Sequence, residues 1–247
     1  MSRQLTSGVL RRKKDNLIKK LAIGFKFDDL SEINSLTTQS IVNNVSIVGN
    51  GKIGSAAEFG VDNLDYIEIS PLGKFGEQLH QAKSITMMAW LYPYSLADGG
   101  NNVRNTVLVH YNRYQQSPLS VVTGFNFQFR NNGKLLIANR SRFEETSFIA
   151  DTEKIINANE WTHIAIQANF TEKSVIVYKN GEIFDSYFDI LNFSQDKYVV
   201  DVQEQKERIG TQAFQQANRG YHGIIDEFYI FNKKLTELEV KKAMLGI

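Results

Sequence analysis

Alternation of apolar and polar side chains is the dominant pattern of this chain. Three phenylalanines alternate with polar residues in 124–130, and Ile164, Ile166 and Ala168 share one face of 162–170. A period of two is typical of antiparallel strands with one buried face. The pattern therefore predicts a protein built mainly from strands.

Turn signals separate the alternating runs. Asn132-Gly133 and Asn180-Gly181 both favour tight hairpins, because Asn and Gly tolerate positive φ. The second pair predicts a hairpin of 174–179 with 182–188. Further strands are predicted at 21–27, 56–59, 65–69, 84–92, 106–111, 134–139, 206–209 and 223–231.

More than ten strands with scarcely a helix between them favour an all-β, two-sheet antiparallel sandwich over a βαβ fold. A short helix is predicted only at the C-terminus, where Thr236 and Glu239 have the spacing of a capping box. The 247 residues, 42% of them hydrophobic, suffice for one large core.

Composition excludes several classes of function. The chain has no Cys, which excludes a disulfide scaffold, a Cys-ligated zinc site and a thiol nucleophile. The formal net charge is +1, which does not indicate a nucleic-acid binder. No apolar run is long enough to span a membrane. The first 20 residues do not resemble a secretory signal, because basic residues occupy the place of its apolar stretch.

Charge divides the chain into two parts. Residues 1–20 carry a net charge of +6, which leaves −5 for the remainder. We therefore predict a basic N-terminal arm at 1–20 and one domain at 21–247. The arm is either a solvated tail or an anchor that binds an acidic partner surface or nucleic acid. The predicted anchoring residues are Arg11, Arg12, Lys13 and Lys14.

Several segments carry a family resemblance. They read FKFD at 25–28, GKIGSAAEF at 51–59, DYIEI at 65–69, SITMMAWLYP at 84–93, NEWTHIA at 159–165, YKNG at 178–181 and GIIDEFYIFNKKLT at 223–236. In this order they resemble the laminin-G-like branch of the concanavalin A-like lectin and glucanase jelly rolls, a branch that is similar to pentraxins. The resemblance runs from about residue 21 to the end and implies a jelly roll with a binding role.

Catalytic signatures are missing from the sequence. Residues 49–54 match the GxGxxG dinucleotide fingerprint, but Gly60 and Asp62 follow too soon for the helix that this motif requires, so a turn between two early strands is predicted. The ExDxxE spacing of glucanases on this fold, the GxSxG elbow and the HExxH pair do not occur. His163 alternates with core residues and is predicted to be structural. We therefore expect no enzyme.

The resemblance also implies a calcium ion, a hard cation that takes oxygen ligands. By motif match the carboxylates are Asp28 and Asp226. The alternative is that Asp28 makes a turn and Asp226 binds backbone amides.

Sugar binding requires aromatic faces and planar polar groups. Tyr111–Gln116 and 139–143 have this composition and are predicted to be loops, with two tyrosines nearby around Pro93. Such residues are also common on any large sandwich surface. The predicted carbohydrate-binding residues are Tyr92, Tyr94, Tyr111, Arg113, Tyr114, Arg140 and Arg142.

The family works mostly outside cells, whereas this chain shows no export signal. A bacteriophage virion protein reconciles the two, since it folds in the host cytoplasm, attaches through its arm and presents the jelly roll to glycans. The alternatives are an extracellular carbohydrate-binding or adhesion module and an architectural decoration protein that binds no sugar.

Overall fold

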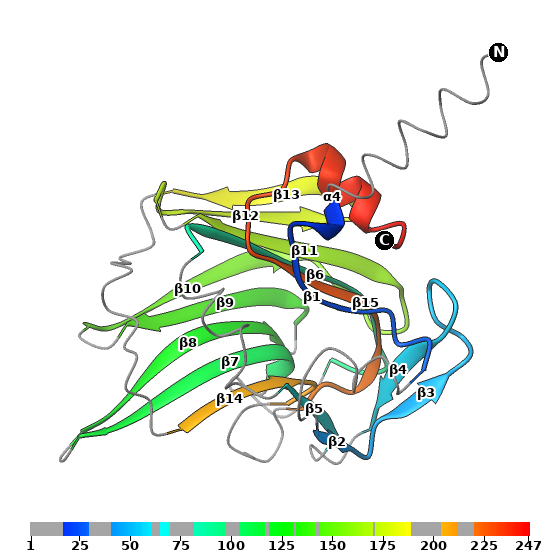
Figure 1. The fold of residues 1–247 in the computed structure, drawn as a ribbon, viewed down its shortest axis with the longest axis horizontal. Helices are drawn as coiled ribbons and strands as arrows, with labels where there is room; N and C mark the ends of the chain where they lie inside the picture. The colour runs from blue at the N-terminus through cyan, green and yellow to red at the C-terminus, as the bar shows by residue number, and fades with distance from the viewer. Residues whose placement is uncertain are drawn as a thin grey trace.

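The computed structural model describes residues 17–29, 41–60, 65–69, 82–96, 104–116, 119–130, 132–141, 144–169, 171–188, 204–211 and 220–247. Within these residues the strands form two antiparallel sheets, one of eight strands and one of seven. Figure 1 shows the sheets as two layers, with a short helix, α4 (Glu237–Ala243), lying against the eight-stranded one. The predicted all-β sandwich is confirmed.

The eight-stranded sheet has the order β13-β12-β11-β6-β15-β4-β3, and β1 pairs with β15. Its strands are β1 (Leu21–Phe25), β3 (Ser46–Val48), β4 (Ala56–Phe59), β6 (Ser84–Pro93), β11 (Thr162–Asn169), β12 (Ser174–Lys179), β13 (Glu182–Tyr187) and β15 (Gly223–Phe231).

The seven-stranded sheet has the order β10-β9-β8-β7-β14-β5-β2. Its strands are β2 (Ile41–Asn43), β5 (Tyr66–Ile69), β7 (Arg104–Gln116), β8 (Leu119–Arg130), β9 (Lys134–Ser141), β10 (Glu144–Lys154) and β14 (Glu204–Ile209).

Every predicted strand is present, but the sequence missed β2, β3 and β10. The predicted loop at Tyr111–Gln116 is wrong, because β7 runs to Gln116 and pairs with β8 along this stretch. The predicted loop at 139–143 is also wrong for residues 139–141, because β9 extends to Ser141. Backbone ladders do not require apolar side chains, so these polar stretches extend as strands.

The predicted turns adopt the backbone conformations that favoured them. Asn180 and Gly181 have φ values of 51° and 83°, and they close the two-residue hairpin between β12 and β13. Residues 49–54 turn the chain between β3 and β4, with the Gly51 N–H bonded to the Gly54 carbonyl at 3.1 Å. No helix follows, which confirms the prediction of a turn.

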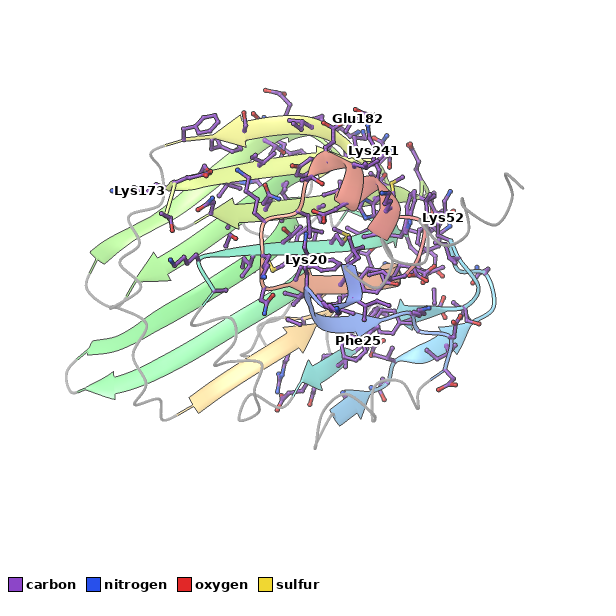
Figure 2. The ribbon with its side chains drawn as sticks, turned by 45° about the horizontal axis from the view of Figure 1, so that its top comes forward. Lys20, Phe25, Lys52, Lys173, Glu182 and Lys241 are labelled. Atoms are coloured by element: carbon purple, nitrogen blue, oxygen red, sulfur yellow. The ribbon has the colours of Figure 1, made fainter. Side chains whose placement is uncertain are left out.

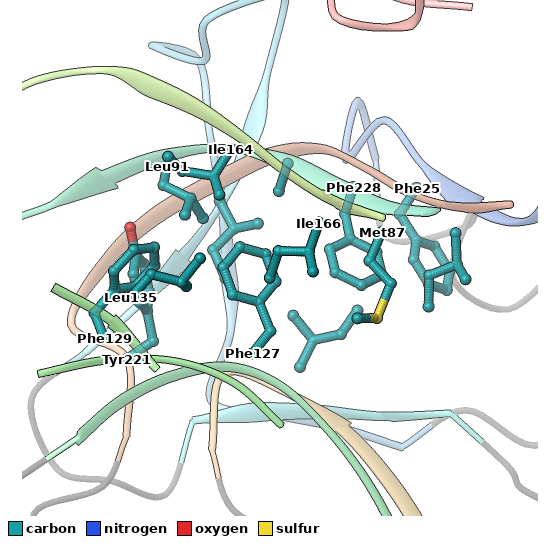
Figure 3. Packing of buried hydrophobic residues seen from close by; sticks show 14 of the residues in the cluster. Phe25, Met87, Leu91, Phe127, Phe129, Leu135, Ile164, Ile166, Tyr221 and Phe228 are labelled. Atoms are coloured by element: carbon teal, nitrogen blue, oxygen red, sulfur yellow. The ribbon is translucent and has the colours of Figure 1, made fainter. Parts of the chain in front are cut away.

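The main core fills the space between the sheets. Ile164 and Ile166 of β11 and Leu91 of β6 extend from one sheet, and Phe127 and Phe129 of β8 from the other. All five are buried, and Figure 3 shows them interdigitating. The alternating apolar residues of the sequence thus face each other across the sandwich.

A second apolar cluster lies on the outer face of the eight-stranded sheet, where Val240 and Ala243 of α4 pack over Met88 and Tyr229. Leu17, only 4% exposed, belongs to this cluster. Leu17, which precedes the predicted start of the domain at residue 21, therefore packs against the sandwich.

Charged contacts fix α4 at this place. The Lys20 ammonium pairs with Glu239. Lys241 pairs with Glu182 of β13 at 2.6 Å, and Figure 2 labels both residues of this second pair. Thr236 and Glu239 form the predicted capping box at the start of the helix.

Candidate functional site

Four aromatic side chains form a continuous group at the end of β6. The ring centroids of Tyr92 and Trp161 are 5.4 Å apart, those of Tyr92 and Tyr94 are 5.9 Å apart, and those of Tyr94 and His222 are 5.3 Å apart. All four residues are half-buried. We call this group the aromatic row.

Strand register brings the aromatic row together. Thr162 of β11 pairs with Leu91 of β6, which sets Trp161 beside Tyr92. The N–H of Tyr94 donates to the His222 carbonyl at 2.9 Å. Because Leu91 points into the main core, Tyr92 lies on the opposite, outer face of the eight-stranded sheet.

Polar groups border the row on the side of β4. The Tyr94 hydroxyl donates to the carboxylate of Glu58, which also accepts from the Ser46 hydroxyl at 3.3 Å. Burial, together with the hydrogen bond and the charge of Glu58, raises the pKa of Tyr94 to about 12. Ser95 Oγ lies 3.0 Å from His222 Nδ1. The row thus combines ring faces with hydrogen-bonding groups.

Trp90 precedes Tyr92 by two residues in β6, so both side chains lie on the same face of the sheet. Its indole N–H donates to the Met244 carbonyl at 2.8 Å, and the Lys52 ammonium sits 4.7 Å from its ring centroid. Figure 2 shows Lys52 and Lys173 at opposite ends of the sheet. Met244 lies just after α4, so the end of the helix lies over Trp90, whereas the four members of the aromatic row are half-buried.

His163 is structural, as the sequence predicted. Its side chain is 1% exposed, its ring packs edge-on against Trp90 at 5.3 Å, and its Nδ1 atom has no hydrogen-bond partner. Burial lowers the pKa of His163 to about 3, so the ring is neutral at physiological pH. A neutral, buried imidazole without access to solvent is not placed for acid–base chemistry.

The predicted carbohydrate-binding residues separate into two groups. Tyr92 and Tyr94 meet in the aromatic row, whereas Tyr111, Arg113 and Tyr114 lie in β7 of the other sheet. In that sheet the predicted Arg140 of β9 pairs with Gly124, which in turn pairs with Tyr111. Arg142 lies outside the described residues. The predicted set therefore does not form a single site.

Sequence reasoning missed Trp161 and His222 as partners of the two tyrosines. Both precede strands far along the chain, and no local pattern relates them to Tyr92. Trp161 belongs to the segment 159–165, which indicated the fold. No pattern in that segment marked Trp161 as a residue of a binding surface.

The two predicted calcium ligands both contact the turn at 49–55. Asp28 Oδ1 accepts from the Ser55 N–H at 3.3 Å, and Asp226 Oδ2 accepts from the Ile53 N–H at 2.8 Å. Asp226 Oδ1 accepts from the Glu227 N–H at 2.7 Å. Among the described residues no three acidic or histidine side chains gather as a metal site would require.

This arrangement fits the amide-binding alternative for Asp226 better than a calcium site. Both of its carboxylate oxygens already accept backbone hydrogen bonds, and the side chain is fully buried. We therefore favour the amide-binding role for Asp226, and no step of the proposed function depends on calcium.

The predicted anchoring residues Arg11, Arg12, Lys13 and Lys14 lie outside the described residues. In the part of the chain that the structure describes, no helix has the length and hydropathy needed to cross a membrane.

Comparison with known proteins agrees with the fold. A family model described as the Concanavalin A-like lectin/glucanases superfamily matches residues 63–241. No curated protein matches the sequence significantly.

Three solved structures show the same fold. Domain 4 of AbnA, an extracellular arabinanase from Geobacillus stearothermophilus solved with arabinotriose, superposes with a TM-score of 0.63 at 19% identity, over 91% of this chain and 98% of that one. The CBM40 domain of the Ruminococcus gnavus IT-sialidase, bound to α2,3-sialyllactose, gives 0.55 at 12% identity, over 84% and 99%. The binding domain of Paraclostridial Mosquitocidal Protein 1 gives 0.60 at 18% identity, over 92% and 52%.

Proposed function

Because the chain belongs to the concanavalin A-like lectin and glucanase superfamily, we propose that it is a non-catalytic carbohydrate-binding domain and that the aromatic row is its binding surface. The observation that carries this proposal is the continuous contact of four half-buried aromatic side chains, Trp161, Tyr92, Tyr94 and His222, at the end of β6.

The chemistry of the row suits a sugar. Aromatic faces pack against the C–H side of a pyranose or furanose ring, while carboxylates and hydroxyls hydrogen-bond to its hydroxyl groups. Trp161 and Tyr92 supply ring faces, and Glu58, Ser95 and His222 supply polar atoms within the same group.

The neighbours support binding rather than catalysis. Two of the solved neighbours hold oligosaccharides, arabinotriose and α2,3-sialyllactose, and a third is named as a binding domain. In this chain the one histidine that alternates with core residues, His163, is buried and neutral at physiological pH, as described above. These observations favour a module that holds a glycan without transforming it.

A glycan array probed with the full chain tests the proposal. Trp161→Ala removes the largest ring face of the row, and we expect at least about a tenfold loss of affinity, which corresponds to about 1.4 kcal/mol. The matched control is Phe188→Ala, which truncates an aromatic side chain that is 64% exposed beyond the edge strand β13. Equal glycan binding by the wild type and Trp161→Ala would refute the placement of the site, and an array without hits would refute carbohydrate binding.

The basic segment supports a second, separate role. Since residues 1–20 carry a net charge of +6, we propose that they anchor the domain on an acidic partner surface, of which a bacteriophage virion is one setting. Leu17 and Lys20 belong to the packed domain, so the appropriate deletion is 1–16. This deletion should leave glycan binding intact and abolish attachment. Mass spectrometry of purified virus particles tests the virion setting, and absence of the chain from them would exclude it.

A further inference from the structure

Four of the five large hydrophobic side chains that are exposed in the described residues gather around α4. Leu238 is 57% exposed and Leu245 is 71% exposed. Met244 keeps helical backbone angles, so Leu238 and Leu245 lie on one face of the helix, two turns apart. This face is opposite the one that buries Val240 and Ala243 in the second apolar cluster. The two leucines therefore point away from the sandwich.

Two isoleucines stand beside the helix. Ile18 is 49% exposed and follows Leu17, which packs with α4 in the second apolar cluster. Ile183 is 54% exposed and pairs with Tyr178 of the same cluster, so its side chain stands on the outer face of the sheet. Figure 1 shows α4 on the outside of the sandwich, beside the first strand and β13. We call the four exposed residues the apolar ridge: Ile18, Ile183, Leu238 and Leu245.

Basic residues accompany the apolar ridge. Lys19 is exposed and Lys242 lies in the last turn of α4, and neither forms an ion pair within the described residues. Residues 1–16, which join the domain at Leu17, contain five basic residues and one acidic residue. Their sequence also includes the apolar residues Leu5, Val9 and Leu10. Both parts of the chain thus combine apolar and basic side chains, as protein segments that bind anionic lipid surfaces do.

Building on the anchor role proposed above for the basic segment, we infer that the apolar ridge and residues 1–16 bind the surface of an anionic lipid bilayer. The ridge leucines enter the boundary between headgroups and acyl chains, while the basic side chains stay at the level of the anionic headgroups. A bilayer deforms around a protruding helix, whereas a protein partner would need a groove that matches it. The charge and the shape of this surface therefore favour lipid.

Vesicle sedimentation with the full chain tests the inference. One set of vesicles contains phosphatidylcholine with about 30% phosphatidylserine, and the comparison set contains phosphatidylcholine alone. We expect at least about tenfold tighter binding to the anionic vesicles. Added salt should weaken this binding, because ions screen exposed charges.

Variants identify the surface. The double variant Leu238→Gln with Leu245→Gln removes the exposed leucines and keeps good helix formers, so it should retain its melting temperature and lose at least about tenfold in vesicle binding. Deletion of 1–16 should cause a similar loss and remove most of the salt dependence. The matched control is Phe188→Gln, which replaces a 64% exposed side chain just beyond the end of β13 that lies away from α4. It should change vesicle binding by less than about twofold.

The outcomes separate this inference from the proposed function. Equal binding to the two kinds of vesicle, or equal vesicle binding by the wild type and the double leucine variant, would overturn the inference. Absence of vesicle binding, together with loss of attachment to virus particles on deletion of 1–16, would assign the anchor to an acidic protein surface and exclude the bilayer. The glycan array is independent of both results, and glycan binding by the double variant equal to that of the wild type would show that the leucines act on lipid alone.

Discussion

Asp226 should make the protein less stable as the pH rises from about 4 to about 7. The side chain is fully buried in β15 beneath the turn at 49–54. Burial raises its pKa from 3.8 to about 7, and the charge of Glu227 adds to this rise, while amide hydrogen bonds from Ile53 and Glu227 oppose it. The raised pKa means that the folded protein holds this proton more tightly than the unfolded chain does.

The sign and the size of the effect follow from linkage. Below pH 3.8 both states are protonated at Asp226, so its full contribution to stability is present. As the pH rises, the unfolded chain ionises first and folding loses about 1.4 kcal/mol per pH unit until the folded carboxyl ionises near pH 7. The total loss is about 4 kcal/mol, and stability is then independent of this group.

Urea unfolding of the wild type and Asp226→Asn from pH 4 to pH 8 measures this contribution. Asn does not titrate, so the difference between the two unfolding free energies reports the Asp226 carboxyl together with its interaction with Glu227, and groups that do not interact with them cancel. We expect the wild type to lose stability relative to the variant across this range and the difference to level off above pH 7. Amide hydrogen bonds that the Asn side chain does not accept lower the unfolding free energy of the variant by an amount that is the same at every pH. Parallel profiles for the two proteins would show that the buried carboxyl does not hold its proton, and the reasoning would be wrong.

Three further predictions concern the turn, the helix cap and the metal. Gly181→Ala should lower the free energy of unfolding by about 1–2 kcal/mol in urea titrations, because position 181 has a φ of 83° that side chains with a Cβ disfavour. Thr236→Ala should cost about 1 kcal/mol by the same measurement through loss of the capping bond to the Glu239 N–H, and an unchanged midpoint would contradict this. Millimolar calcium or EDTA should leave the melting temperature unchanged, because both oxygens of Asp226 already accept amide hydrogens. A rise with calcium would instead support the predicted metal role of Asp28 and Asp226.

The sequence predicted the parts of the fold that depend on local chemistry. Strict alternation in 124–130 and 162–170 identified β8 and β11, because one face of each strand must be buried whatever its neighbours are. Asn180-Gly181 identified a hairpin, since few other dipeptides accept two positive φ values. Polar strands without alternation, such as β10, gave no such signal.

The site was harder to predict because it depends on pairing between distant segments. Tyr92 was nominated, but Trp161 was not, since only the register of β11 against β6 brings the two rings together. Tyr111 and Arg140 shared the expected composition but belong to the other sheet. Composition identifies residue types that bind sugars, whereas long-range register decides which of them meet.

The outer face of the eight-stranded sheet shows how one surface can serve both stability and binding. At one end α4 covers Met88 and Tyr229, and the Met244 carbonyl bonds with the Trp90 indole. Beyond Trp90 the same face continues into the half-buried aromatic row. The row is therefore built on paired strands adjoining a packed apolar cluster. Such support keeps aromatic rings in fixed orientations, which reduces the entropy lost when a ligand binds.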